Sequence, residues 1–199
     1  MKPSTKGFLL GLFAGVTLIV VVEVVGFFLL SLVAQKMMDS RGGFGRMALS
    51  EPRFPSADRL ELHGAADESW VLTSLDGSEL SFGELRGKTV FLNLWATWCG
   101  PCVMEMPAIE SLYESVREDR NVALVLVSEE DPETVDAFAR QQGWDLPLYV
   151  ATTRPEVFRS RGVPATFVID PEGAVVYRHI GAADWDSDGC RAFLSELSR

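Results

Sequence analysis

The sequence predicts an α/β domain in which helices cover both faces of a mixed β-sheet. Apolar, β-prone runs alternate with helical patterns between residues 89 and 151. A hairpin pattern comes later, at residues 165–180, where two apolar runs flank Pro171-Glu172-Gly173. Parallel strands joined by helices, followed by a hairpin, give a sheet that mixes parallel and antiparallel strands.

The domain is predicted to begin with a hairpin. Residues 70–75 and 78–82 are β-prone runs on either side of Asp76-Gly77, a dipeptide typical of tight hairpin turns. Residues 89–95 then form an apolar run that predicts a buried strand. Residues 104–120 carry apolar side chains at helical spacing and predict the first helix of the domain.

A second strand and helix follow directly. Residues 121–128 are almost continuously apolar, which is typical of a strand covered on both faces. Asp131 is a suitable N-cap, Pro132 fits the first helical position, and Gly143 ends the predicted helix. The remaining predicted elements are a strand at 146–151, a short helix at 154–161, strands at 165–170 and 174–180, and a helix at 185–197.

A long apolar run precedes the domain. Residues 8–34 contain one charged side chain, Glu23. At about 1.5 Å per helical residue they can cross a hydrocarbon layer of about 30 Å with some tilt. A cleaved signal peptide is the alternative, but its apolar part usually spans only about 7 to 15 residues. We therefore predict one N-terminal transmembrane helix within residues 1–35.

Two further segments complete the predicted organisation. Residues 36–68 include Gly42-Gly43 and two prolines and show little apolar periodicity, so we expect a flexible tether. Residues 69–199 form the predicted domain. Lysine and arginine side chains flank both ends of the apolar run, so the positive-inside rule does not fix its orientation.

Charge is distributed unevenly along the chain. Residues 1–50 contain five Lys and Arg against two Asp and Glu, whereas residues 51–199 contain 13 against 26. Residues 51–199, which include the predicted domain, therefore carry a net charge of −13. This argues against nucleic-acid binding, which favours a basic surface. It is compatible with basic protein partners or simply with a solvated acidic surface.

The most informative segment is Trp95-Ala96-Thr97-Trp98-Cys99-Gly100-Pro101-Cys102. Cys99 lies just before the predicted helix, where free backbone N–H groups and the helix dipole favour a thiolate. Cys102 lies one turn further on the same helical face, so the two side chains can form a disulfide. In such pairs the thiol pKa falls from about 8.5 to roughly 3.5–7.5. The segment is therefore suited to thiol-disulfide exchange.

The residues around the pair favour redox chemistry over metal binding. Gly100 has no side chain to shield the first cysteine. Pro101 has no backbone N–H, but in the first turn of a helix this group would have no partner within the helix. A structural zinc site would need a second cysteine pair or two nearby histidines. Cys190, His63 and His179 lie too far apart in sequence to form that set. We predict no metal and no cofactor.

Several further residues extend the motif into a family resemblance. They are Glu105 and Pro107, then Val163-Pro164-Ala165-Thr166-Phe167, and Gly181 near the last hairpin. With them the chain resembles the thioredoxin superfamily, and within it the membrane-anchored TlpA/ResA-like thiol-disulfide oxidoreductases. The resemblance covers about residues 69–199 and implies a thioredoxin-like fold. The segment 122–150 is similar to the central insertion of this branch.

The resemblance also implies which residues contact the substrate. Val163-Pro164 would be a cis peptide beside the cysteines, with the Val163 backbone free to pair with an incoming chain. An ordinary trans proline is the alternative. Trp98, Gly100 and Pro101 would surround the reactive thiol, with Trp98 as an apolar contact surface.

Proton transfer is where the chain departs from thioredoxin itself. Thioredoxin has a buried aspartate beneath its second cysteine; the matching residue here is Asn93, and an amide cannot take a proton at neutral pH. Glu105, one turn beyond Cys102, resembles the acidic residue of the TlpA/ResA-like branch. We predict that Glu105 accepts the proton of Cys102, with a pKa raised by burial. A solvated surface glutamate is the alternative.

The predicted catalytic residues are Cys99, Cys102 and Glu105. The resemblance implies a reductant of protein disulfides, recharged by a transmembrane thiol donor, in cytochrome c maturation or copper-centre assembly. Because disulfides persist outside the cytoplasm, we expect a single-pass protein of the bacterial cytoplasmic membrane. Its domain would face the periplasm or the extracytoplasmic side.

Two other functions are open. A copper-binding metallochaperone would hold Cu(I) through Cys99 and Cys102, with Met104 and Met106 as added soft donors. The helical spacing of these methionines instead favours core packing. A thiol peroxidase would need a Pro-x-x-x-Thr-x-x-Cys setting, which this sequence lacks.

Overall fold

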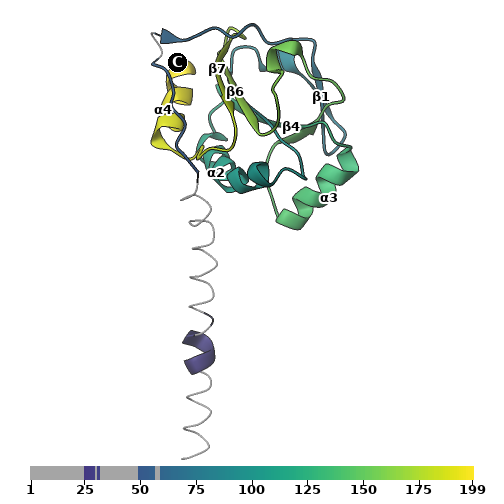
Figure 1. The fold of residues 1–199 in the computed structure, drawn as a ribbon, viewed down its shortest axis with the longest axis vertical. Coiled ribbons are helices and arrows are strands. Elements are labelled where there is room, and N and C mark those ends of the chain that lie inside the picture. Colours follow the sequence, from purple (N-terminus) through teal and green to yellow (C-terminus); the bar gives the residue numbers. More distant parts are fainter. Residues whose placement is uncertain (1–24, 30, 32–48, 57–58) are drawn as a thin grey trace, which may run out of the picture. The chain divides into compact units, whose positions relative to one another are not determined.

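The computed structural model describes residues 25–29, 31, 49–56 and 59–199 (Figure 1). The chain divides into two compact units, residues 1–44 and 45–199. The second unit is a β-sheet with helices packed against it.

A seven-stranded mixed sheet forms the centre of this unit, in the order β2-β1-β5-β4-β3-β6-β7. β3, β4 and β5 are parallel neighbours, and the other pairs are antiparallel. The strands are β1 (Val71–Ser74), β2 (Glu79–Ser81), β3 (Thr89–Leu94), β4 (Val122–Ser128), β5 (Leu148–Val150), β6 (Ala165–Ile169) and β7 (Val175–Ile180). The helices are α2 (Gly100–Val116), α3 (Pro132–Gln142) and α4 (Asp188–Leu197), and 3-10 turns occur at η2 (Phe82–Leu85) and η3 (Glu156–Phe158).

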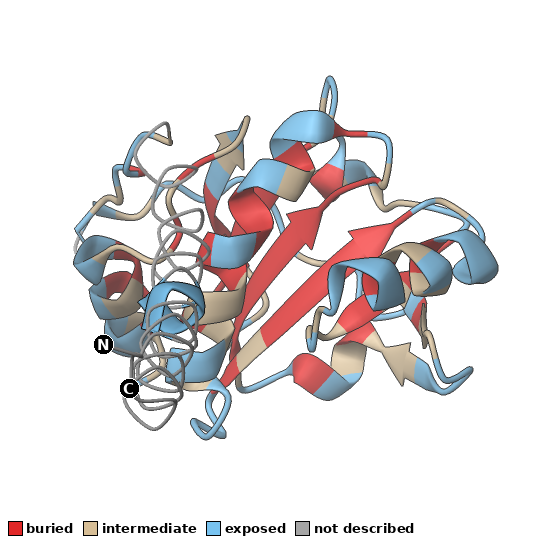
Figure 2. Ribbon diagram, turned by 90° about the horizontal axis from the view of Figure 1, so that it is seen from below, coloured by how far each residue is buried: buried red, intermediate tan, exposed pale blue. Residues whose placement is uncertain are grey.

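The helices α2, α3 and α4 all lie on one face of the sheet, which corrects the expectation of helices on both faces (Figure 2). Their buried side chains share one core with alternate residues of the strands, such as Phe91 and Leu126. The crossovers from β3 to β4 and from β4 to β5 run in the same direction along the sheet. Because such crossovers are right-handed, both place their helices on the same side.

The opposite face is covered by the 3-10 turns and by loops. The other strand residues, including Leu92 and Phe167, point into this second core. Phe158 of η3 lies at its centre, with its ring 5.4 Å from Trp70 and 5.3 Å from Phe167. The helix expected at residues 154–161 is thus a single 3-10 turn that places one aromatic side chain in the core.

Local sequence signals set most element boundaries. The hairpin of β1 and β2 is confirmed, as is α3, whose N-cap Asp131 accepts a hydrogen bond from the Thr134 N–H at 2.8 Å. Gly143 ends α3 with a φ of 73°. α2 begins directly after its N-cap Cys99, as expected, but ends at Val116 rather than at residue 120. α4 begins at residue 188 rather than 185, after its N-cap Ser187.

The segment before residue 69, expected to be a tether, packs against the domain in its described part. Phe54 stacks on Phe193 and lies 4.7 Å from the ring of Tyr177. His63 donates a backbone hydrogen bond to Val175. These contacts bury apolar rings, so the packed part of the chain begins before the expected boundary.

The transmembrane prediction lies almost entirely outside the described residues. Of residues 8–34, the structure describes 25–29 and 31, which are helical. Within the described part of the chain, no helix combines the length and apolar character that a membrane crossing requires.

Candidate active site

The active-site residues come from four strand ends that meet at one edge of the sheet. β3 ends at Leu94, next to the start of β6 at Ala165 in the antiparallel pair. The start of β6 in turn lies beside the end of β7 at Ile180. The parallel strand β4 ends at the same edge as β3. Segments that follow or precede these ends therefore converge, although they are far apart in sequence.

Cys99 and Cys102 form a disulfide at the start of α2, with an S–S distance of 2.08 Å. Cys99 is the N-cap of the helix, and its Sγ accepts a hydrogen bond from the backbone N–H of Cys102 at 3.2 Å. This donor, together with the positive end of the helix dipole, favours negative charge on the Cys99 sulfur once the bond is reduced. Cys102 is fully buried.

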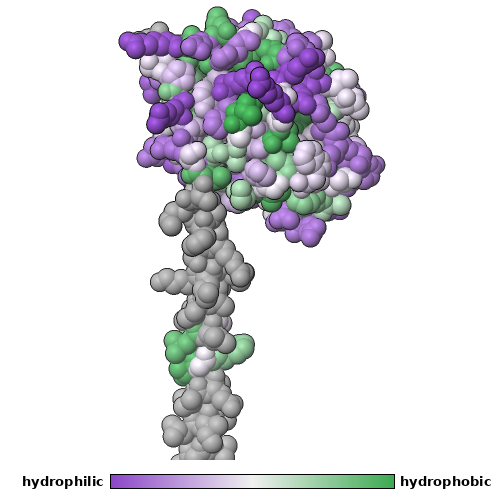
Figure 3. Space-filling model, in the orientation of Figure 1, coloured by the Kyte–Doolittle hydropathy of each residue, from purple (hydrophilic) through white to green (hydrophobic). Residues whose placement is uncertain are grey.

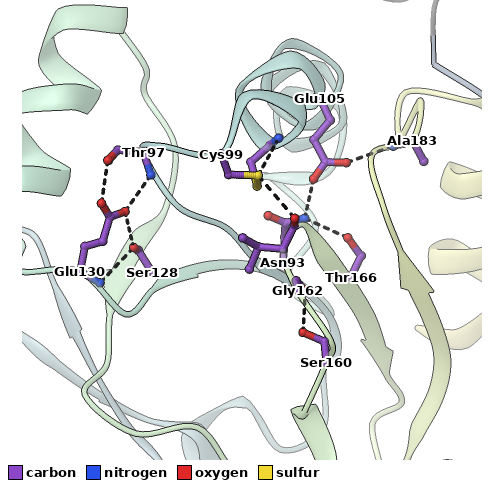
Figure 4. Close-up of a disulfide and its surroundings, with 12 residues drawn as sticks. Asn93, Thr97, Cys99, Glu105, Ser128, Glu130, Ser160, Gly162, Thr166 and Ala183 are labelled. Carbon is purple, nitrogen blue, oxygen red and sulfur yellow. Dashed lines mark hydrogen bonds between the residues drawn. A yellow bond between two sulfur atoms is a disulfide. The ribbon is translucent and has the colours of Figure 1, made fainter.

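Glu105 lies on the same helix and is completely buried, so the surface alternative is wrong. Its Oε1 accepts a hydrogen bond from Asn93 Nδ2 at 2.9 Å. Its Oε2 accepts from the Ala183 backbone N–H at 3.1 Å and from Trp185 Nε1 at 2.8 Å. Asn93 also donates to Thr166 Oγ1 at 2.9 Å, which ties β3, β6 and α2 together beneath the disulfide (Figure 4).

Burial raises the pKa of Glu105 to about 7. The hydrogen bonds from Trp185, Asn93 and Ala183 oppose this rise because they stabilise the carboxylate. The balance leaves a carboxyl group that can gain and lose a proton near neutral pH. That is the property required of a general base or acid.

The Val163-Pro164 peptide is cis, as the resemblance implied. It precedes β6, and the Val163 carbonyl oxygen lies 3.5 Å from Cys99 Sγ. Pro164 is buried and Val163 is half-buried. The antiparallel pairing of β3 and β6 therefore brings together two motifs separated by 64 residues.

The residues beside the disulfide are exposed, although Cys99 itself is only 4% exposed. The Trp98 side chain is 74% exposed, and Gly100 and Pro101 are also exposed. A pocket of about 180 Å³ lies beside Trp98 and Val163 and is bordered by Arg154, which precedes η3. Elsewhere the visible face of the domain is mostly hydrophilic, with small separate apolar areas (Figure 3).

Glu130, which the sequence reasoning missed, fixes the loop that carries the dithiol. Its carboxylate accepts hydrogen bonds from the Thr97 N–H and the Thr97 hydroxyl, both at 2.7 Å, and from the Ser128 hydroxyl at 3.0 Å (Figure 4). A signal was present: Glu130 follows a strand predicted to lie parallel to the one before the cysteines. Residues after neighbouring parallel strands share one edge of the sheet.

The remaining sulfur-containing residues do not join the disulfide. Cys190 is a free, buried thiol whose pKa is raised to about 12 by burial. Met106 is buried in the core, as its spacing predicted, whereas Met104 is half exposed. Among the residues that the structure describes, no group of three or more His, Cys, Asp or Glu side chains is arranged to hold a metal ion.

Comparison with known proteins agrees with this geometry. The chain matches the AhpC/TSA family over residues 64–178. It is 33% identical over 131 residues to the thiol-disulfide oxidoreductase ResA of Bacillus anthracis, covering 64% of this chain and 75% of that protein. The ResA of Halalkalibacterium halodurans is 36% identical over 129 residues, covering 63% and 73%.

Solved structures of the same fold include a thioredoxin-family thiol:disulfide interchange protein from Chlorobium tepidum. It is 25% identical, with a TM-score of 0.54, and the match covers 73% of this chain and all of that one. The dsbF protein of MTB, in mixed oxidised and reduced forms, is also 25% identical with a TM-score of 0.54, covering 65% and 96%.

Fold and site together define a thioredoxin-like thiol-disulfide oxidoreductase with a Cys-X-X-Cys redox pair. The chain belongs to the AhpC/TSA family, and within it to the ResA-like thiol-disulfide oxidoreductases. Enzymes of this class act on protein thiols or disulfides.

Proposed function

We propose that this protein is a membrane-anchored reductant of extracytoplasmic protein disulfides, of the kind used in cytochrome c maturation or copper-centre assembly. One observation carries the proposal: a buried carboxyl with a pKa near 7, that of Glu105, lies one helical turn beyond the inner cysteine of the redox pair. This arrangement supplies a proton acceptor for the step in which the inner thiol must ionise.

The dithiol form would react in two steps. The Cys99 thiolate attacks one sulfur of the substrate disulfide, forming a mixed disulfide and releasing the first substrate thiolate. The Cys102 thiol transfers its proton to Glu105 and attacks Cys99 Sγ, releasing the second substrate thiolate. Two electrons pass to the substrate, and the protein is left with the Cys99–Cys102 disulfide seen in the structure.

The substrate chain would dock across the exposed residues around Cys99. Trp98 offers an exposed apolar surface, and the exposed residues Gly100 and Pro101 lie beside Cys99, which is itself only 4% exposed. On the other side, the Val163-Pro164 peptide is the expected backbone contact, close to the reacting sulfur. These residues line an open face next to a pocket large enough for one side chain.

The cellular setting rests on the sequence. The apolar run at residues 8–34 is long enough for a single span. Stable protein disulfides, the substrates of this chemistry, occur outside the cytoplasm. We therefore propose a single-pass protein of the bacterial cytoplasmic membrane with its domain on the extracytoplasmic side, reduced by a transmembrane thiol donor.

A trapping experiment tests the substrate and the direction of electron flow together. Cys102→Ser keeps the attacking thiol but removes the resolving one, so the full-length variant in its own membranes should accumulate a mixed disulfide through Cys99. Cys99→Ser is the matched control and should trap no substrate. Cys190→Ser should behave as wild type because that thiol is buried.

Recovery of a haem-attachment or copper-centre precursor would support the proposal, whereas recovery only of proteins undergoing oxidation would reverse the direction. Two assays on the full-length chain address the other functions. Retention of stoichiometric Cu(I) through gel filtration, with no disulfide reduction, would favour a metallochaperone. Peroxide turnover that depends on Cys99 would favour a peroxidase.

A further inference from the structure

We propose that Trp185 is a positioning residue for thiol exchange, whose indole N–H orients the Glu105 carboxylate and stabilises its ionised form for proton transfer from Cys102. This inference rests on the proposed role of Glu105. It adds a residue from the far end of the chain to the active site, in the loop between β7 and α4.

The contacts of Trp185 support a dedicated role for its N–H group. Nε1 donates to Glu105 Oε2 at 2.8 Å, and the Ala183 N–H donates to the same oxygen at 3.1 Å. Trp185, Ala183 and Glu105 are all fully buried, so water does not substitute for these donors in the packed site. The loop therefore supplies two of the three donors to the carboxylate.

The surrounding structure fixes the indole ring. Its face-to-edge contact with Phe91 of β3 has a centroid distance of 5.2 Å at 79°. His179 of β7 stands edge-on to the same ring at 5.4 Å. Ser187 caps the following helix and anchors the other end of the loop. Trp185 is thus held between the sheet and α4 with its N–H directed at Glu105.

This donor opposes the effect of burial. Burial disfavours the charged form of Glu105, and a hydrogen bond to the carboxylate favours it. Trp185 is the largest of the hydrogen-bonding influences that lower the pKa of Glu105. Without this donor, the carboxyl should remain protonated to a higher pH. It would then be a poorer proton acceptor at neutral pH.

Other titratable groups lie around this contact. They are Cys102 on α2, His179 on β7, Asp184 and Asp186 beside Trp185, with Asp186 paired to Arg191, and Cys190 on α4. Burial lowers the pKa of His179, so it titrates on the acid side of its ordinary value of 6.5. If the pH midpoint for attack by Cys102 rises above 7 in a variant, titration of His179 does not explain the rise.

Trp185→Phe tests the proposal because it removes the N–H and keeps an aromatic ring. The reduced full-length chain is mixed with an aromatic disulfide whose thiol product is coloured. The first phase of colour reports attack by Cys99, and the second reports resolution by Cys102. We expect the midpoint of the second phase to rise by about one pH unit. That shift would slow the second phase about fivefold at pH 7, with little difference above about pH 9.

Trp70→Phe is the matched control. Trp70 is also a buried tryptophan whose Nε1 donates a hydrogen bond, at 2.8 Å to the Thr153 carbonyl, but it lies in the other core. We expect both kinetic phases of this variant to match wild type. An equal shift of the second phase in both tryptophan variants would overturn the proposal, since the effect would then follow from general loosening.

A double mutant separates this inference from the proposed function. If Trp185 acts through Glu105, adding Trp185→Phe to Glu105→Gln should not slow the second phase further. A further slowing of fivefold would refute the positioning role while leaving Glu105 as the proton acceptor. If Glu105→Gln alone left the second phase and its pH dependence unchanged, the proposed role of Glu105 would fail first.

If Trp185→Phe does not fold, NMR on the wild-type chain provides a second test. The indole N–H resonance of Trp185 should shift with pH with a midpoint near 7, and this shift should vanish in Glu105→Gln. The other four tryptophans are internal references. A Trp185 resonance that does not respond to Glu105 ionisation would contradict the hydrogen bond on which the proposal depends.

Discussion

At the scale of single residues, the environment decides what Glu105 can do. A glutamate on the surface of a helix would be ionised at neutral pH and would be too weak a base to hold a proton there. Here burial raises the pKa of Glu105 to about 7, and three hydrogen-bond donors stabilise the ionised carboxylate. In the proposed mechanism Glu105 serves in place of the buried aspartate of thioredoxin, whose position in this chain is occupied by Asn93.

The raised pKa of Glu105 also makes folding stability depend on pH. The folded chain holds this proton more tightly than the unfolded chain, so the contribution is intact below about pH 4.5 and declines as pH rises toward 7. Glu105→Gln removes the titration. We expect the stability of the variant relative to wild type to increase by about 2 to 3 kcal/mol between pH 5 and pH 8. Urea unfolding at several pH values measures this difference.

A difference in stability between Glu105→Gln and wild type that stays constant between pH 5 and pH 8 would show that Glu105 does not titrate in this interval.

At the scale of elements, the loop between β3 and α2 is held by hydrogen bonds to the loop after β4. Glu130 accepts three of them, and two come from Thr97 immediately before Trp98 and Cys99. The helix start thus has a fixed relation to the sheet. Glu130 therefore helps to fix the position of Cys99 through Thr97, without a hydrogen bond of its own to either cysteine.

Glu130→Gln should destabilise the fold by about 1 to 2 kcal/mol, because a charged acceptor serving several donors becomes a neutral amide. Glu129→Gln is the neighbouring control. Glu129 is half exposed and pairs with Arg154 at 2.8 Å, so its loss should change stability by less than about 1 kcal/mol. Denaturant unfolding of both variants measures the loss in free energy of unfolding. Equal losses would mean that the hydrogen bonds from Thr97 to Glu130 do not stabilise the fold more than the exposed ion pair of Glu129 does.

The end of α3 provides a test of backbone conformation. Gly143 has a φ of 73°, a region that side chains disfavour, and an added Cβ would meet nothing within 4 Å. Gly143→Ala should therefore cost about 1 kcal/mol from backbone strain alone. Gly162→Ala also adds a methyl into open space, but without a positive φ, and should be nearly neutral. Thermal unfolding of the two variants compares them directly.

At the scale of the whole molecule, the packed domain includes chain that the sequence pattern assigned to a tether. Phe54 stacks on Phe193 and packs against Tyr177, and thereby joins the N-terminal segment to β7 and α4. The Asp184 N–H donates to the Ser50 carbonyl at 3.0 Å, which links the same segment to the loop that carries Trp185. The active site and the N-terminal segment therefore share supporting contacts.

Phe54→Ala should lower the free energy of unfolding by about 2 to 3 kcal/mol, because it removes a ring packed against two others. Leu62→Ala, in the same segment but 71% exposed, should change it by less than about 0.5 kcal/mol. Limited proteolysis should then cut near residue 54 faster in the first variant. Equal stability of both variants would contradict the packing of this segment against the domain and would support the expectation of a tether.

Local chemistry accounts for what could be predicted from the sequence. The Cys99-Gly100-Pro101-Cys102 motif, the strand and helix alternation, and the cap residues Asp131 and Gly143 each act through neighbours within a few positions. Hydrophobic period and turn residues are visible in a linear pattern. The dithiol, the mixed sheet and most elements followed from these signals.

The tertiary structure alone decided how the active site is completed. Trp185 and Ala183 reach Glu105 across 80 and 78 residues of sequence, and no linear pattern links them. The same is true of the helices gathered on one face, which depends on strand order. The sequence by itself determined the reactive thiols. The fold determined the environment of Glu105, the proposed proton acceptor, because burial and long-range donors exist only once the strand ends meet.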